Sequence, residues 1–298
     1  MAYLWLCLAA LAAGVVNSVA GGGTLLTFPT LFHVLRSARN GAVVANATST
    51  VALVPGSLAS AWGYRQEMKE ARRWFWLLLG PCLAGGVVGA LLLTVLDPRY
   101  FDALVPWLIL AAALLFLAQP TVLRWSRASK HQGPPSARMV AFMVVFQFFV
   151  AIYGGYFGAG IGILMLSALG VMGMGDIHQM NALKTVLGAV INGVAVLVFI
   201  AENTIAWRYA LAMTVAAIVG GYFGARVARR LQPQLVRGIV IVIGFSLAAF
   251  FFYQRWRGTE AQPPEHLKPQ AIRRGKGNEQ ATRPRRQPGR PYPSSVRS

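Results

Sequence analysis

Acidic residues are scarce in this sequence, with nine Asp and Glu among 298 residues against 28 Lys and Arg. All nine fall in predicted loops, at the ends of apolar runs, or in the last 40 residues. Carboxylates inside membrane spans are costly, and proton- and cation-driven carriers keep them as relays or ligands. Their absence from the apolar runs argues against a cation substrate.

Histidine and cysteine are also rare, with four and two copies. The histidines lie outside the centres of apolar runs, and Cys7 and Cys82 alone are too few for a metal site. No Ser–His–Asp set is visible either. The sequence therefore predicts that the protein is not an enzyme, has no catalytic residue, and uses no metal or cofactor.

Apolar residues make up 56% of the chain, mean hydropathy is +0.52, and only 12% of residues are charged. Because about 20 residues span a bilayer as a helix, we expect an all-α polytopic membrane protein of about eight transmembrane segments. The expected segments are 2–32, 41–63, 74–96, 103–123, 139–170, 179–200, 207–228 and 236–254.

Glycines interrupt the first and fifth of these segments, at Gly21–Gly23 and at Gly158–Gly162. Glycine is a poor helix former, so both helices are predicted to break there. In lipid, an opened helix is tolerated only where its backbone faces protein or a water-filled cavity. The amide groups that start the next half-helix attract anions, and two such breaks in corresponding positions are typical of transporters.

The two halves of the chain repeat. A constant shift of 135 positions pairs Asn46 with Asn181, and it pairs the Gly-Gly-x-x-Gly motif at Gly85 with the one at Gly220. We therefore predict two homologous four-segment halves, 1–126 and 139–254, joined by a basic loop at 127–138. The Gly-Gly-x-x-Gly motifs predict close helix–helix packing.

The segment 255–298 holds 11 of the 28 basic residues, three acids and several prolines. It predicts a disordered tail that lies on anionic lipid headgroups. It has no aromatic platform or fold for nucleic acid, so we expect no nucleic-acid partner.

Orientation depends on how the interrupted segments lie. If each crosses once, the N-terminus, the basic loops at 65–73 and 124–138, and the tail share one side, which the positive-inside rule makes cytoplasmic. If they are re-entrant hairpins, all three basic clusters, including 226–237, share the cytoplasm and the tail lies outside. We expect single crossings and a cytoplasmic tail.

Lys184 is the one cation that falls well inside a predicted span and not at its end, about two turns into its helix. Its ammonium group either extends to the membrane interface or provides a fixed positive charge in a cavity wall. Polar residues near Asn46 in the second segment either bond to neighbouring helices or contact ligand. The predicted substrate-binding residues are Asn17, Gly21, Gly22, Gly23, Thr24, Asn46, Thr48, Ser49, Gly158, Gly160, Gly162, Asn181, Lys184 and Thr185.

Several motifs together resemble the sulfite exporter TauE/SafE family of membrane permeases: Ala20–Gly23, Asn46–Ser49, Gly154–Gly162, Asn181–Lys184 and the two Gly-Gly-x-x-Gly helices. The resemblance covers the chain from Met1 to Tyr253 and leaves the tail outside. It implies transport of sulfur oxyanions such as sulfite or organosulfonates, usually outward across the bacterial inner membrane. It supplies no ligand signature for individual residues.

The predicted function is a secondary transporter for a small anion, with a sulfur oxyanion as the expected substrate. An anion channel, or a structural membrane protein whose glycines only pack helices, are the alternatives. The predicted partners are the anion and the lipid bilayer, and the sequence does not set an oligomeric state.

Overall fold

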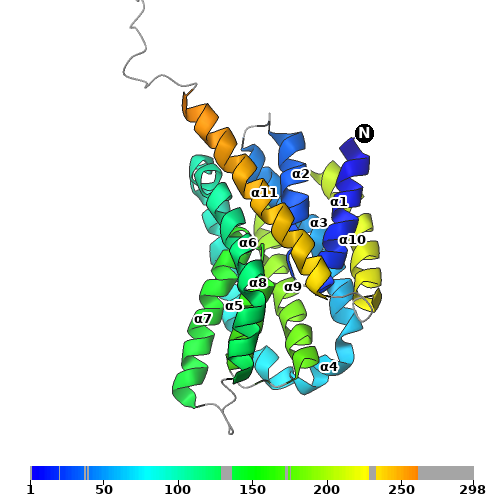
Figure 1. Cartoon of the computed structure of the whole chain (residues 1–298), viewed down its shortest axis with the longest axis vertical. Helices are drawn as coiled ribbons and strands as arrows, with labels where there is room; N and C mark the ends of the chain where they lie inside the picture. The colour runs from blue at the N-terminus through cyan, green and yellow to red at the C-terminus, as the bar shows by residue number, and fades with distance from the viewer. Residues whose placement is uncertain are drawn as a thin grey trace, which may run out of the picture. The chain divides into compact units, whose positions relative to one another are not determined.

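The computed structural model describes residues 2–19, 21–36, 38, 40–128, 136–171, 174, 176–227 and 233–260. Every regular element in these ranges is a helix, which confirms the all-α prediction (Figure 1). The elements are α1 (Ala2–Val19), α2 (Thr24–Leu35), α3 (Gly41–Gly63), α4 (Arg65–Glu70), α5 (Arg72–Val95), α6 (Pro98–Ala128), α7 (Ala137–Tyr156), α8 (Ile161–Val171), α9 (Ile177–Ala201), α10 (Trp207–Val227) and α11 (Pro233–Glu260).

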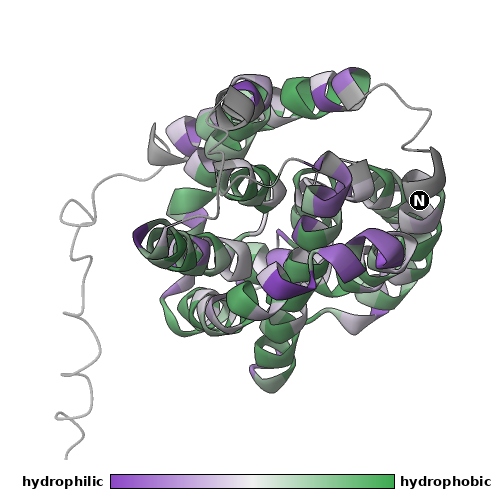
Figure 2. Ribbon diagram, turned by 90° about the horizontal axis from the view of Figure 1, so that it is seen from below, coloured by the Kyte–Doolittle hydropathy of each residue, from purple (hydrophilic) through white to green (hydrophobic). Residues whose placement is uncertain are grey.

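The helices are apolar enough for lipid. Six of those in the described ranges are long and hydrophobic enough to cross a membrane, namely α3, α5, α6, α7, α9 and α11. Hydrophobic residues dominate the ribbons seen from the end that carries α4 (Figure 2). The chain is an integral membrane protein. Residues 1–253 form one compact unit, and residues 254–260 continue α11 into a second.

Side chains mark the start of two helices. The Ser136 hydroxyl accepts a hydrogen bond from the amide of Met139 before α7, and Asp176 accepts one from the amide of His178 before α9. Both caps satisfy amides that have no partner inside the helix. They place the beginnings of α7 and α9 at polar positions between the apolar runs.

The helices α1 and α2 form a hairpin that opens at the end of the molecule opposite α4. α1 runs beside α10 in the same direction, because Leu11 lies against Gly220 and Val15 against Gly224. α3 also starts at the end where α1 starts (Figure 1). α2 leads into α3 after five residues, so α2 must return to the end from which α1 came.

The helices α7 and α8 form a second hairpin, which opens at the α4 end. α7 runs beside α5 in the same direction, because Phe148 lies against Gly85 and Ile152 against Gly89. Since α5 begins directly after α4, α7 also begins at the α4 end. α8 leads after five residues into α9, whose Gln179 donates a hydrogen bond to α4. α8 therefore returns to the α4 end.

The expectation that each interrupted segment crosses the membrane once is wrong. Each segment instead enters and leaves at one end, and the two hairpins open in opposite directions. The chain reverses at glycines with positive φ, which are Gly21 at 76°, Gly158 at 81° and Gly160 at 79°. The start of α1 consequently lies at the end opposite α4 and the start of α7, and not on their side.

Each Gly-Gly-x-x-Gly helix packs against the hairpin of the other part of the chain. In α5, a Cβ placed on Gly85 would lie 2.5 Å from the carbonyl oxygen of Phe148 in α7. In α1, a Cβ placed on Gly14 would lie 2.6 Å from the carbonyl oxygen of Ala217 in α10. Backbone thus touches backbone in both pairs, which is how small residues bring membrane helices together. Helices from the N-terminal part of the chain are therefore packed directly against helices from its C-terminal part.

Replacement of Gly85 by Leu should destabilise the fold, because its side chain has no room between α5 and α7. Overpacking of this kind costs about 1–3 kcal/mol of the free energy of unfolding. The same change at Gly80, on the same helix, is the control, because no atom lies within 4 Å of a Cβ placed there. Thermal unfolding of the purified variants in detergent measures both. Equal melting temperatures for Gly85→Leu and Gly80→Leu would contradict the packing described here.

The hairpin topology predicts that Ala2 and Gln66 lie on opposite sides of the membrane. After replacement of Cys7 and Cys82 by Ala, single cysteines at Ala2 and Gln66 should react with an impermeant maleimide from opposite sides of oriented vesicles. Labelling of both cysteines from the same side would contradict the hairpin topology and support single crossings.

Candidate functional site

A cavity lies where the two hairpins meet. Its walls come from both ends of the chain, and the space open to the centre of a water molecule is about 30 Å³, roughly twice what one water needs. The lining residues are Asn17, Gly21, Thr24, Leu53, Ser57, Gly158, Ile161, Gly162, Met165, Lys184, Thr185, Gly188, Ala189 and Asn192. The cavity has room for a small ion with few heavy atoms.

The two glycine-containing links touch at this cavity. A Cβ placed on Gly21 would lie 3.3 Å from the Cα of Gly162, and one placed on Gly158 would lie 4.0 Å from the hydroxyl of Thr24. Thr24 begins α2 and Ile161 begins α8, and both line the cavity. Two helix N-termini therefore meet here, and each carries about half a positive elementary charge.

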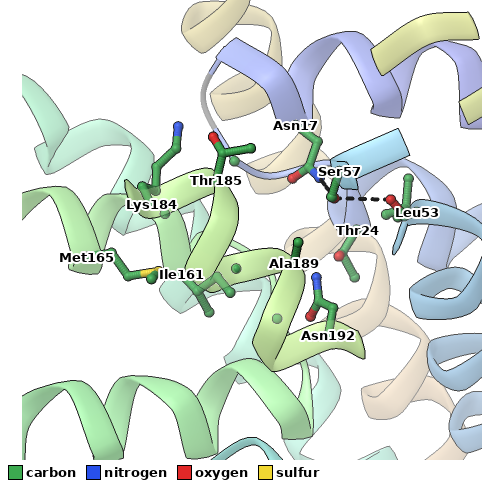
Figure 3. A pocket seen from close by; sticks show the side chains of 14 residues that line it. Asn17, Thr24, Leu53, Ser57, Ile161, Met165, Lys184, Thr185, Ala189 and Asn192 are labelled. Atoms are coloured by element: carbon green, nitrogen blue, oxygen red, sulfur yellow. Dashed lines mark hydrogen bonds between the residues drawn. The ribbon is translucent and has the colours of Figure 1, made fainter. Parts of the chain in front are cut away.

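Lys184 adds a full charge to the same place. Its side chain is 3% exposed, and its Nζ has no hydrogen-bond partner. It extends toward the link between α1 and α2, where a Cβ placed on Gly21 would lie 4.0 Å from Nζ (Figure 3). Burial of an unpaired ammonium costs several kcal/mol, and no described residue accepts a hydrogen bond from Lys184 Nζ.

The wall from α1 and α3 is polar but largely satisfied by its own bonds. Asn17 donates from Nδ2 to the Ser57 hydroxyl at 2.8 Å, and Ser57 donates to the carbonyl of Leu53 at 3.0 Å (Figure 3). On α9, the Thr185 hydroxyl donates to the carbonyl of Asn181 at 2.8 Å. Thr185 and Ser57 can therefore accept further hydrogen bonds, while Lys184 has three donors to offer.

Seven of the predicted substrate-binding residues line the cavity together: Asn17, Gly21, Thr24, Gly158, Gly162, Lys184 and Thr185. The other seven do not line it. A Cβ on Gly22 would collide with the ring of Phe116, and one on Gly23 would lie 2.6 Å from the carbonyl oxygen of Ala13. Both glycines therefore serve close packing. Gly160 lies near Ala112, 3.7 Å from its Cα by the same measure.

The predicted polar residues of α3 bond to protein. Asn46 donates from Nδ2 to the carbonyl of Tyr156 at the end of α7, at 3.0 Å. Thr48 accepts from the amide of Ala206 before α10, at 3.0 Å, and Ser49 bonds to a threonine of α2. These residues tie α3 to the ends of three other helices. Asn181 lies outside the cavity, although its carbonyl accepts from Thr185.

Sequence reasoning missed two polar residues of the cavity, Ser57 and Asn192. The repeat in the sequence could have identified them, because the shift of 135 positions pairs Ser57 with Asn192 just as it pairs Thr50 with Thr185. Both lie about two turns after the polar cluster of their helix. Both residues were overlooked because they are surrounded by apolar residues in the sequence.

A membrane-embedded helical fold with a buried cation at the meeting point of two hairpins is typical of a membrane transporter. The model of the sulfite exporter TauE/SafE family matches residues 6–251. The chain belongs to this family.

Three similar proteins are each described as a probable membrane transporter. A probable membrane transporter protein of Haemophilus influenzae is 26% identical over 246 residues, which cover 82% of this chain and 92% of that protein. The probable membrane transporter protein YfcA of Escherichia coli K12 is 25% identical over 244 residues, 82% of this chain and 87% of that protein. A probable membrane transporter protein, ORF9, of Sinorhizobium is 25% identical over 251 residues, 82% of this chain and 90% of that protein.

Replacement of Lys184 by Met should stabilise the protein when no anion is present, because the variant buries no unpaired charge. We expect a higher melting temperature in anion-poor detergent buffer. The exposed Lys69 of α4 gives the control, since Lys69→Met should leave the melting temperature unchanged. A lower melting temperature for Lys184→Met would show that Lys184 has a stabilising protein partner.

Proposed function

We propose that this protein is a secondary carrier that exports a small anion, and that its substrate is a sulfur oxyanion such as sulfite or a short organosulfonate. One observation carries the proposal, which is the buried and unpartnered ammonium of Lys184 beside the N-termini of α2 and α8. The family description supports sulfite as the first anion to test.

The charges around the cavity suit an anion of charge one to two. Two helix N-termini supply about half an elementary charge each, and Lys184 supplies one more. Donors and acceptors on Thr24, Asn17 and Asn192 complete the polar surroundings. Seven of the nine acids fall among the described residues, in loops or near helix ends, and none of these seven lines the cavity. Any proton that moves with the substrate would therefore travel on it, as bisulfite.

The architecture proposed for this function has eight membrane segments in two duplicated halves of inverted topology. The hairpins α1–α2 and α7–α8 are its two glycine-interrupted segments, and the site lies between them. Inverted repeats with broken helices at the substrate site are common in secondary transporters. Opening of the site toward one side and then the other follows from movement of one hairpin-bearing bundle against the other.

The hairpins also change the proposed orientation. The helix ends that border the basic stretches 124–138 and 226–237 fall at the α4 end, beside the basic residues of α4 itself, so by the positive-inside rule the proposed orientation puts this end in the cytoplasm. Tyr253 ends the first unit at the opposite end, because α11 begins after α10 has reached the α4 end. The expected cytoplasmic tail falls on residues 255–298, of which 261–298 lie outside the described ranges.

Transport into proteoliposomes tests the proposal. The purified protein should take up labelled sulfite with saturation and show counterflow, and Lys184→Met should lower uptake at least about tenfold, which is the loss of about 1.4 kcal/mol of interaction. Lys69→Met should transport as the unaltered protein does. Sulfite should also raise the melting temperature of the unaltered protein and not that of Lys184→Met.

Three outcomes contradict parts of the proposal. Uptake without saturation or counterflow identifies a channel. Unchanged transport by Lys184→Met shows that the lysine does not bind the anion. No uptake of sulfite or any sulfonate refutes the proposed substrate class.

A further inference from the structure

Gly188 occupies an unusual place in the cavity wall. It lies on α9 one turn after Lys184 and one turn before Asn192, at spacings of four residues, so the three residues share one helix face. All three line the cavity. No atom lies within 4 Å of a Cβ placed on Gly188.

Packing does not explain this glycine. The glycines of the helix contacts, such as Gly14, Gly56 and Gly85, would each bring a Cβ within 2.7 Å of a backbone oxygen on another helix. Gly188 has no such neighbour, yet glycine inside a helix costs about 1 kcal/mol relative to alanine. Among the glycines with no neighbour within 4 Å of a placed Cβ, Gly188 is the one that lines the cavity, and its missing side chain leaves free space in the wall.

The repeated sequence shows the contrast within one molecule. The shift of 135 pairs Gly188 with Leu53, and both residues line the cavity. Leu53 is buried on the α3 side and fills its part of the wall. The wall is therefore filled at one of the two equivalent positions and left open at the other, on the helix that carries Lys184.

The open position lies one helical turn from Lys184. Four residues along an α-helix correspond to about 6 Å, so the backbone positions of Gly188 and Lys184 lie about 6 Å apart along α9. Both residues line the same cavity, so a small substituent on an anion bound there would find its free space at Gly188. Bare sulfite needs no such space.

From this geometry we infer that Gly188 determines the size of the transported anion, and that its open space accepts the carbon substituent of a short alkyl sulfonate whose sulfonate group binds at Lys184. The inference rests on the proposed anion site and specifies which substrates enter it. Gly188 acts through the volume that it leaves free and contributes no hydrogen-bonding group.

Competition between two anions of different size tests the assignment. The unaltered protein in proteoliposomes should transport both sulfite and ethanesulfonate. A pocket discriminates about 10- to 200-fold for one methylene group. Gly188→Ala should therefore lower kcat/KM for ethanesulfonate several-fold relative to sulfite, and Gly188→Leu at least tenfold.

Gly193 provides the matched control. It lies on the same helix, has no atom within 4 Å of a placed Cβ, and does not line the cavity. Gly193→Ala and Gly193→Leu should leave the ratio of sulfite to ethanesulfonate transport unchanged. Because alanine favours the helix over glycine, the Gly188→Ala protein should fold and report the ratio even if Gly188→Leu is poorly produced.

The possible failures are distinguishable. If the unaltered protein transports neither anion, the proposed function is contradicted. If it transports both, and the ratio stays the same in Gly188→Ala and Gly188→Leu, only the role of Gly188 is overturned. Transport of sulfite with no transport of ethanesulfonate by the unaltered protein also overturns it, because the open space then admits no substituent.

Discussion

Backbone amides and carbonyls cannot remain unpaired in lipid, and this constraint explains the centre of the structure. A helix that opens at glycine exposes several such groups, each at a cost of several kcal/mol in an apolar medium. The two opened links therefore lie against each other, with Gly21 near Gly162 and Gly158 near Thr24. The polar backbone that lipid excludes is gathered in one place, and two helix N-termini come together as a consequence.

Close packing of other helices holds this arrangement. The most extensive helix contacts join α1 to α10 and α5 to α7. Each hairpin is therefore packed against a glycine-rich helix from the other part of the chain. The bundles that pack tightly are thus not the two halves of the sequence. One contains α1, α3 and α10, and the other contains α5, α7 and α9, and the cavity lies between them. A substrate at this boundary contacts both bundles at once, which suits a carrier whose bundles move relative to each other.

The charged groups around the cavity determine the sign of its electrostatic potential. Lys184 is buried without a partner among the described residues, and no carboxylate lines the cavity. A fold that keeps this charge unpaired loses stability at this position, and an anion bound in the cavity, as proposed, would recover it. At the sequence shift of 135, the position paired with Lys184 is Ser49, which carries no charge and bonds to Thr27.

The sequence by itself determined the membrane class, the helical fold, the family, and half of the cavity residues, because hydrophobic length and glycine breaks are local properties of the chain. It named Lys184, since a cation inside an apolar run is visible in one dimension. Only the tertiary structure decided that the interrupted segments turn back, because reversal at Gly21 and Gly158 depends on backbone angles that glycine allows but does not require. Only the structure separated Asn46, Thr48 and Ser49, which bond to other helices, from Ser57 and Asn192, which line the cavity. Which face of a membrane helix meets a cavity depends on its neighbours, and two of these, Tyr156 for Asn46 and Ala206 for Thr48, lie more than a hundred residues away in the chain.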